Sequence, residues 1–555
     1  MSKTPFFSQV QLPSVKRSLF DKTFENKLSC NMGFLVPIMC EECVPGDKYR
    51  IRPEIFARMA PMVAPIMHRV DIFTHSFFVP TRLIWADFAN YVSGGSSGTL
   101  EPVKPYFDFS NLVDSGLDFY KPSTLWDYLG LPTFTNLNTS SVQNEKICSL
   151  PFRAYQLIYN EFYRDKNLYG DNPWNVPVSS GRENHSNIPE LLTLRRRSWQ
   201  KDYFTSALPF AQRGPEVSIP LGDTAPVTYD GTKGRQRLMG ANTNNPLTIL
   251  ANENVTVTSN GSNYQEMNAA LIVPFDIDNS AKLSVDLSNA TAITINALRR
   301  ANAIQRFFER SAVGGSRLIE SNFAHFGVKG KDATLQRPQY LGGSMQTFMI
   351  SSVLQNAPTS DASVESGLLG SFAGNGISSS SNRPITHYCD EQGYIITIMS
   401  IMPRTSYQQG LPRMFSRFTR FDEYFPEFSH LGEQSVKQKE LYFNPYDSDY
   451  NELDFGYQSR FSDMKYRSDE VHGDFRDSMD YWHMGRKFVD PNNIGSQDSK
   501  WEGSQPPVLN KDFVECHPTQ RIYNVTLEEY DKVYCDCLIK CKALRPMPVF
   551  GTPSF

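Results

Sequence analysis

The sequence has no excess of charge of either sign. Its 555 residues include 55 lysines and arginines and 59 aspartates and glutamates, for a formal net charge of −4 and a pI near 6.2. A protein that binds nucleic acid through its overall charge has a clear basic excess. The composition therefore argues against a general nucleic-acid binder, and contact with a polyanion would need local basic groups or a basic partner.

Long apolar runs and catalytic motifs are also missing. Residues 1–13 lack the order of a signal peptide, and the apolar run at 33–39 is too short to span a membrane. We therefore expect no membrane insertion, and nine reduced cysteines in a cytoplasmic setting. The sequence contains no P-loop, no G-x-S-x-G elbow and no H-E-x-x-H helix. These absences predict a protein that is not an enzyme and needs no cofactor.

Aromatic and turn-forming residues are abundant instead. Aromatic side chains make up 13% of the chain, with 34 glycines and 36 prolines, which is typical of short strands joined by turns. The run Gly33-Phe-Leu-Val-Pro-Ile-Met39 is apolar at consecutive positions and predicts a strand covered on both faces. A Pro-Gly-Asp turn and a second strand follow it. Further strands are predicted at 70–80, 343–350, 394–401 and 531–544, and helices at 151–170 and 295–308.

One internal region differs in composition from the rest. Residues 216–294 contain three aromatic residues and eight acidic against four basic ones, and Asn, Thr, Ser and Gly dominate. Such a region has little material for a core of its own, so we interpret it as an exposed insertion. The predicted organisation is an N-terminal arm over 1–27, a β-rich body over 28–215 and 295–555, and the insertion between them.

Local basic groups are the candidate contacts for nucleic acid. Three consecutive arginines precede Trp199, and more lie on one predicted helix face after residue 295. Arginines beside an aromatic ring can bind phosphate and stack a base, although an interface salt-bridge cluster fits the same pattern. The arm has a mild net charge of +3, five positive minus two negative, and is either a solvated terminus or an arm on neighbours or nucleic acid. The candidates are Lys16, Arg17, Arg195, Arg196, Arg197, Arg299 and Arg300.

Two groups of residues imitate metal sites. Cys40-Glu-Glu-Cys43 has zinc-like spacing, and Cys535, Cys537 and Cys541 lie at the other end of the chain. In a strand these three cysteines share one apolar face, so core packing is our interpretation and zinc the alternative. Asp447-x-Asp449-x-Asn451 begins like a calcium loop but has neither its glycine nor its closing glutamate. We predict no metal site.

An ordered set of short motifs resembles the major capsid protein of small single-stranded DNA phages, the Microviridae, in particular the gokushovirus branch. The set covers the chain outside the insertion, and its members are Gly33-Phe-Leu-Val-Pro with Pro45-Gly-Asp47, Phe78-Val-Pro-x-Arg82, Leu335-x-Arg-Pro-x-Tyr-Leu-Gly-Gly343, His430-Leu-Gly-Glu-Gln434, Gly456-Tyr-x₂-Arg460 to Lys465-Tyr466 and Arg545-Pro-Met-Pro548.

The resemblance implies an all-β fold, an eight-stranded antiparallel viral jelly roll with helical and loop insertions. It implies a T=1 icosahedral shell of sixty copies around circular single-stranded DNA, assembled in the bacterial cytoplasm. The implied partners are further copies of the chain, the genome, a small basic DNA-binding protein, an internal scaffolding protein and a host receptor. The insertion would form threefold protrusions, with Tyr229, Asn254, Asn260 and Tyr264 as candidate host contacts.

Two further expectations follow. In a jelly roll the first and last strands are neighbours, so the Gly33 strand should pair with the strand at 531–544, which would bring Cys40 and Cys43 towards Cys535 and Cys537. The alternative function is a carbohydrate-binding or carbohydrate-hydrolysing β-sandwich, although no pair of carboxylates in the sequence stands out for it. A sequence-independent single-strand binder is a third possibility that the low pI argues against.

Overall fold

The computed structural model describes most of the chain. Contacts divide the chain into two compact units, residues 1–213 with 309–555 and residues 214–308. The described residues are 16–114, 117–134, 143–168, 174–215, 217, 227–229, 238–240, 256–260, 263–268, 271–277, 283–285, 295–314, 317–328, 330–354, 372–488, 507–525 and 530–550.

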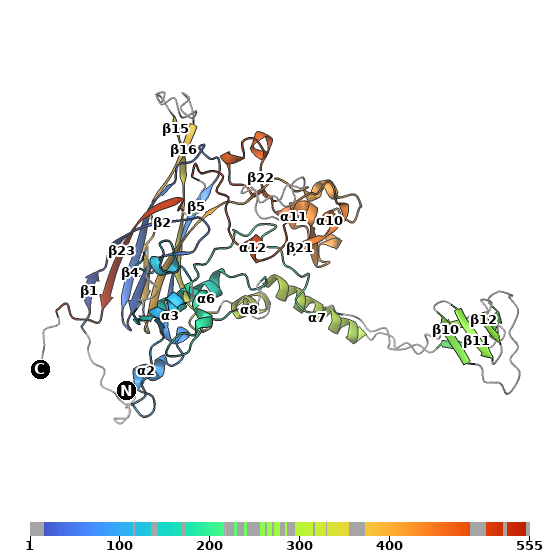
Figure 1. Ribbon diagram of the computed structural model, residues 1–555, viewed down its shortest axis with the longest axis horizontal. Coiled ribbons are helices and arrows are strands. Elements are labelled where there is room, and N and C mark those ends of the chain that lie inside the picture. Colours follow the sequence, from blue (N-terminus) through green and yellow to red (C-terminus); the bar gives the residue numbers. More distant parts are fainter. Residues whose placement is uncertain are drawn as a thin grey trace. The chain divides into compact units, whose positions relative to one another are not determined.

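The first unit is built on two antiparallel sheets (Figure 1). The larger sheet has the order β1-β23-β4-β16-β15, with β2 paired to β23 and β17 paired to β4. Its strands are β1 (Ser18–Asp21), β2 (Phe24–Cys30), β4 (Lys48–Met59), β15 (Met349–Leu354), β16 (Phe372–Ser381), β17 (Ile385–Tyr388) and β23 (Val533–Arg545).

The smaller sheet has the order β14-β5-β18-β3. The central strand β18 pairs along its whole length with β5, and Ile396 lies between Phe77 of β5 and Cys40 of β3. The predicted strands at 70–80 and 394–401 are thereby confirmed. The bounds are β3 (Val36–Cys43), β5 (Val70–Pro80), β14 (Gln339–Thr347) and β18 (Gly393–Pro403).

A core formed by both sheets lies between them. Residues of β3, β5 and β18 pack there against the inward faces of β4 and β23. On β23 every second residue from Val533 to Ala543 is buried. This alternation confirms that Cys535, Cys537 and Cys541 pack in the core, where a thiol behaves as a small apolar group.

A second core covers the other face of the smaller sheet. The sheet contributes Phe77, Val79, Ile396 and Ile398, and helices from residues 81–192 contribute the opposing side chains. Both faces of β18 are therefore covered, and all eleven of its residues are buried. Val36–Met39 in β3 are likewise all buried, which confirms the prediction that the Gly33 run is a strand covered on both faces.

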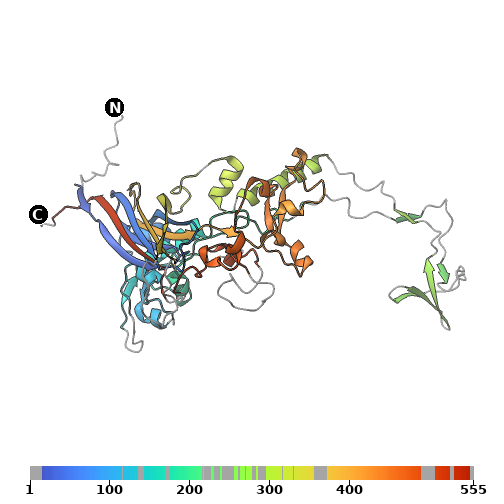
Figure 2. The ribbon, with the colours of Figure 1, turned by 90° about the horizontal axis from the view of Figure 1, so that it is seen from above.

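The helical layer lies beside the sheets in Figure 2, in light blue to teal. The helix predicted at 151–170 is an α-helix that continues as one π-helical turn and ends at Tyr163. The layer contains α1 (Thr81–Ile84), α2 (Phe88–Ser93), β6 (Tyr106–Asp108), α3 (Phe109–Asp114), α4 (Leu125–Tyr128), β7 (Lys146–Cys148), α5 (Leu150–Ile158), η3 (Tyr159–Tyr163), η4 (His185–Asn187) and α6 (Ile188–Leu192).

A third, smaller core lies under the loops of residues 404–525. Tyr203, Phe204, Val436, Leu441 and Phe513 belong to it. The elements here are β19 (Ser406–Tyr407), η5 (Arg413–Ser416), η6 (Pro426–Phe428), β20 (Glu433–Lys437), α9 (Gln438–Leu441), α10 (Ser448–Glu452), β21 (Asp454–Ser459), α11 (Ser462–Lys465), β22 (Asp469–Glu470), η7 (Gly473–Arg476), η8 (Asp480–Trp482) and α12 (Lys511–Val514), and α8 (Leu318–Phe326) also belongs to this unit.

The second unit contains the predicted insertion. Strands β10, β11, β12 and β9 form a four-stranded antiparallel sheet, and β8 pairs with β13. The helix predicted from residue 295 is present as α7. The bounds are β8 (Val227–Tyr229), β9 (Leu238–Gly240), β10 (Thr256–Asn260), β11 (Asn263–Asn268), β12 (Leu271–Ile277), β13 (Leu283–Val285) and α7 (Ile295–Gly314).

Two expectations about the N-terminal part need correction. The Gly33 strand β3 pairs with β18, not with the last strand β23, whose neighbours are β1, β2 and β4. The predicted arm does not extend to residue 27, because Ser18–Asp21 and Phe24–Cys30 form strands of the larger sheet. The residues of β2 alternate in burial, and Phe24 and Leu28 pack on the core between the sheets.

Candidate assembly and binding surfaces

The arginine triple runs beside the residues that lead into β3. The Arg197 amide donates to the Gly33 carbonyl, and the Leu35 amide donates to the Arg195 carbonyl. The Arg195 guanidinium donates to the carboxylate of Glu190 at 2.6 Å. The backbone of the triple therefore pairs with the residues just ahead of β3, and the Arg195 side chain belongs to an ion pair on the helical layer.

The three guanidinium groups have different surroundings. That of Arg196 lies 3.9 Å from the centre of the Phe34 ring and donates to the Cys516 carbonyl at 3.1 Å. That of Arg197 lies 4.3 Å from the centre of the Phe73 ring and donates to Ser400 Oγ at 2.8 Å. Burial lowers the pKa of Arg197 below its usual value. Within the described part of the chain, the ion pairs do not include Arg197.

The other predicted basic contacts are more exposed. Lys16 and Arg17 are exposed ahead of β1, and Arg17 Nη2 donates to the Tyr388 hydroxyl at 3.3 Å. Arg299 and Arg300 are exposed on α7, in the second unit. Five of the seven predicted residues therefore belong to the first unit, and Arg299 and Arg300 belong to the second.

The predicted host contacts lie in the second unit. Tyr229 is the last residue of β8, while Asn260 and Tyr264 lie on the hairpin formed by β10 and β11. Asn254 lies outside the described residues.

The cysteines with zinc-like spacing do not meet. Cys43 contacts Cys389, and Cys535 contacts Cys30. Burial raises the pKa of Cys40 to about 12 and that of Cys541 to about 11, so both remain thiols. Across the described ranges, no group of three or more His, Cys, Asp or Glu side chains is placed to hold a metal ion. In the calcium-like segment, Asp447 instead caps helix α10 by accepting from the Tyr450 amide.

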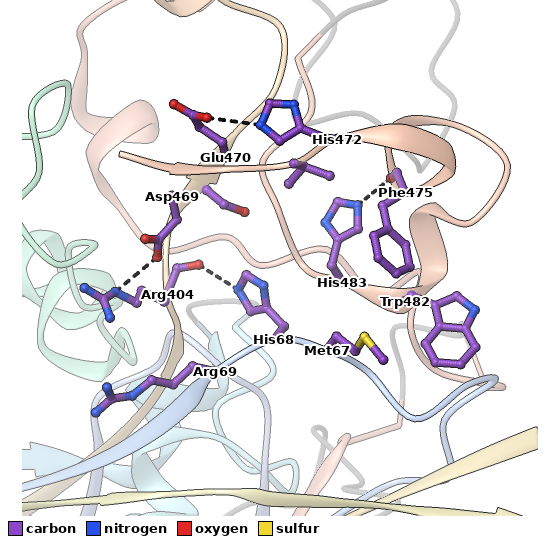
Figure 3. A pocket seen from close by; sticks show the side chains of 12 residues that line it. Met67, His68, Arg69, Arg404, Asp469, Glu470, His472, Phe475, Trp482 and His483 are labelled. Carbon is purple, nitrogen blue, oxygen red and sulfur yellow. Dashed lines mark hydrogen bonds and ion pairs between the residues drawn. The ribbon is translucent and has the colours of Figure 1, made fainter. Parts of the chain in front are cut away.

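A small cavity of about 280 Å³ lies where β19 and β22 pair (Figure 3). His68 Nε2 donates to the Arg404 carbonyl at 2.7 Å, and Arg404 forms an ion pair with Asp469 at 3.3 Å (Figure 3). His483 similarly donates to the Phe475 carbonyl at 2.7 Å. Burial lowers the pKa of His68 to about 4, so this ring is neutral at neutral pH. These contacts join loops to one another, and we assign them a structural role.

Among the described residues, exposed apolar side chains gather in the segment 414–431, which we name the aromatic surface. Phe418 is 87% exposed there. Two ion pairs hold this segment on the third core, Arg413 with Glu440 at 3.0 Å and Arg417 with Asp463. Exposed apolar patches of this kind mark sites of protein–protein contact. The exposed residues of the aromatic surface are Met414, Phe415, Phe418, Phe421, Tyr424, Phe425 and Leu431.

Two packed antiparallel sheets with an exposed aromatic surface are typical of a protein that assembles with other proteins. Residues 8–555 match the family model described as capsid protein (F protein), and the chain belongs to this family of phage capsid proteins.

Three curated relatives agree with this assignment. The chain is 32% identical to capsid protein VP1 of Chlamydia phage 1, 33% identical to that of Bdellovibrio phage phiMH2K and 28% identical to that of Spiroplasma virus 4. Each alignment covers 99% of this chain and 97% of the relative. The predicted role as a structural, non-enzymatic capsid protein of a phage virion is confirmed, and the carbohydrate-active alternative is set aside. In the described part of the chain, no helix is long and apolar enough to cross a membrane.

Proposed function

We propose that this capsid protein assembles into a T=1 icosahedral shell of sixty copies around a circular single-stranded DNA genome. The observation that carries the assembly is the aromatic surface. Leaving Phe418 and its neighbours in water is unfavourable, by about 25 cal/mol for each Å² of apolar area. Contact with a second copy removes this cost, and a closed symmetric shell repeats the contact at every subunit.

The strand order supports an eight-stranded jelly roll. With β1, β15 and β17 taken as additions at the edges, eight strands remain in the two sheets: β2, β3, β4, β5, β14, β16, β18 and β23. Numbered one to eight along the chain, they give the order 1-8-3-6 in the larger sheet and 2-7-4-5 in the smaller. This is the interleaved order that two Greek keys produce in a double sheet.

Charge balance supports a basic partner inside the shell. The genome has one negative charge per nucleotide, and the chain itself has a net charge of −4. This balance supports the small basic DNA-binding protein as a partner, and the internal scaffolding protein is proposed from the family resemblance alone. Lys16, Arg17, Arg299 and Arg300 are exposed, which supports contacts with DNA or the basic protein.

The insertion is proposed to form the threefold protrusions that contact the host receptor. Its residues belong to a compact unit separate from the two large sheets. Its low aromatic content supports an exposed position. Under this proposal Tyr229, Asn260 and Tyr264 contact the host surface.

Assembly of purified protein tests these proposals. Complete shells should have a mass of sixty times 63.1 kDa, about 3.8 MDa, by mass photometry. The double variant Phe418→Ser with Phe421→Ser should abolish shells, since it removes apolar area without touching a core. The matched control, Phe418→Leu with Phe421→Leu, should keep them. A chain without residues 220–290 should still assemble but fail to attach to host cells.

Three results would contradict the proposals. Normal shells from the serine variant would show that the aromatic surface does not hold subunits together. Closed particles of another mass would exclude the T=1 shell. Full attachment of particles that lack residues 220–290 would exclude the insertion as the host contact.

A further inference from the structure

The first unit contains a large cavity that none of the assignments above uses. Its volume is about 790 Å³, inside the range of about 300–1,000 Å³ that small-molecule sites occupy. We name it the Arg197 pocket. It is lined by residues from β5, η3 and β14, the start of α8, and the loops around residues 164–167, 197–201 and 206–208.

The lining of the Arg197 pocket is strongly basic. Five cationic side chains stand against the two carboxylates of Asp165 and Glu320, so the lining has a net charge of +3, five minus two. His75 adds nothing at neutral pH, because burial lowers its pKa to about 4. In a chain with an overall charge of −4, this local excess indicates an anionic ligand. The cations are Arg164, Lys166, Arg197, Lys201 and Arg317.

Arg197 has no carboxylate partner among the ion pairs of the described residues, and Arg164 donates to Asn160 Oδ1 at 3.0 Å. Lys166, Lys201 and Arg317 form ion pairs with Glu161, Asp165 and Glu320. Arg197, in contrast, has the Ser400 hydroxyl and the rings of Phe73 and Tyr163 around it. Partial burial of a guanidinium is unfavourable unless an anion compensates it, and no ion pair among the described residues supplies one.

Uncharged polar side chains also line the pocket, among them Asn167, Ser198 and Gln200. Together with the cations, they favour a ligand that is rich in hydrogen-bonding groups.

Aromatic rings also line the pocket. The ring centres of Phe77 and Tyr340 are 5.5 Å apart, and those of Phe77 and Phe162 are 4.7 Å apart. Tyr340 is 47% exposed, so part of its ring is open to a ligand. Aromatic rings beside cations are the arrangement by which proteins bind single-stranded nucleic acid, with bases on rings and phosphates on cations.

We infer that the Arg197 pocket binds one nucleotide of single-stranded DNA, with its phosphate at Arg197 and its base stacked on Tyr340. The inference rests on the proposed enclosure of a single-stranded genome and adds the place of contact. The inference also gives the three arginines different roles. Arg195 stabilises the fold through Glu190, and Arg196 does so through Phe34 and Cys516. Arg197 binds the ligand.

Binding of a fluorescent oligothymidylate to the purified full-length protein tests the inference by anisotropy. Arg197→Met and Tyr340→Ala should each weaken binding by about tenfold, the loss expected for one phosphate contact or one stacked base. The matched controls lie outside the pocket. Arg467→Met removes an exposed arginine, Tyr534→Ala removes a tyrosine that is 50% exposed, and both should bind like the wild type.

Competitors identify the part of the ligand that is recognised. Thymidine monophosphate should displace the oligonucleotide at lower concentration than inorganic phosphate, because it supplies a base as well as charge. Equal displacement by the two would overturn the nucleotide assignment in favour of a phosphate site. Stronger displacement by a sulfated oligosaccharide would overturn it in favour of an anionic glycan.

Folding and assembly are controlled separately. If Arg197→Met fails to fold, Tyr340→Ala decides the question, because it leaves every pocket cation in place. Wild-type binding by a folded Tyr340→Ala protein would overturn the inference. Failure of this inference can be told apart from failure of the proposed function. Variants that form shells of normal mass but bind the oligonucleotide weakly support the pocket. A wild-type protein that forms no shells contradicts the proposed assembly and says nothing about the pocket.

Discussion

The two sheets of the first unit differ in how many of their faces are covered. The smaller sheet lies between the larger sheet and the helical layer, so all eleven residues of β18 are buried. The larger sheet is covered on one face, and β23 alternates between buried and more exposed residues. The difference explains why β18 is apolar at consecutive positions, whereas β23 alternates between apolar and polar residues. A side chain is apolar where the face of the sheet that it lies on is covered.

Breaking a buried ion pair on the helix-covered side should have the largest effect. Arg153 and Glu183 are 0% and 1% exposed, and Arg153 Nε donates to Glu183 Oε1 at 2.6 Å. Glu183→Gln keeps the shape but leaves the guanidinium charge buried, so we expect a loss of about 3–5 kcal/mol in the free energy of unfolding. Denaturant titration measures it.

The larger sheet provides the matched control. Its Glu54 pairs with Lys540 at 2.9 Å on the outer face, where the Lys540 side chain is 47% exposed. Glu54→Gln should cost less than about 1 kcal/mol, because water screens an exposed pair. Equal losses in the two variants would show that the helical layer does not seal the smaller sheet.

Truncating apolar side chains tests the same comparison through packing. Ile395 and Ile396 are adjacent on β18 and belong to different cores. Ile395→Ala and Ile396→Ala should each cost about 2–5 kcal/mol, since each leaves a cavity. On β23, Ile539→Ala should lower the free energy of unfolding by as much. Tyr534→Ala, on the open face, should lower it by less than about 1 kcal/mol. A small loss for Ile396→Ala would mean that one face of β18 is open.

Sequence patterns identified which faces are covered but not which strands pair. The consecutive apolar run at Gly33 correctly predicted burial on two sides, because burial is a property of each residue's own position. Its partner was predicted wrongly, since β3 and β18 lie more than 300 residues apart and nothing local specifies that contact. The strand β2 was missed because its outward residues, such as Glu25 and Lys27, are polar; the alternation of Phe24, Leu28 and Cys30 was the available signal.

The candidate site was predictable only in part. The arginine triple beside Trp199 was visible as a basic and aromatic motif, and Arg197 and Trp199 do line the large pocket. The other pocket residues come from β5, η3 and β14, and His75, Tyr163 and Tyr340 are separated by 88 or more residues in the sequence. Only the folded smaller sheet brings them together, so no local spacing could have identified them.

The pH should also affect stability, through the helix-covered face of the smaller sheet. His75 Nδ1 lies 2.7 Å from the Tyr163 hydroxyl, and Arg197 and Tyr340 also face the ring. Burial, and then the charge of Arg197, lower the pKa of His75 from 6.5 to about 4. Between these pH values the unfolded chain binds a proton that the folded chain does not, so stability is complete above pH 6.5 and falls as the pH drops towards 4. We expect His75 to account for a loss of up to about 3 kcal/mol in the free energy of unfolding.

Denaturant titrations at several pH values should show a steeper loss of stability for the wild type than for His75→Gln, which has no titrating ring. Parallel curves for the two proteins would mean that His75 is accessible to water, and that the outer face of β5 is less well covered than that of β18.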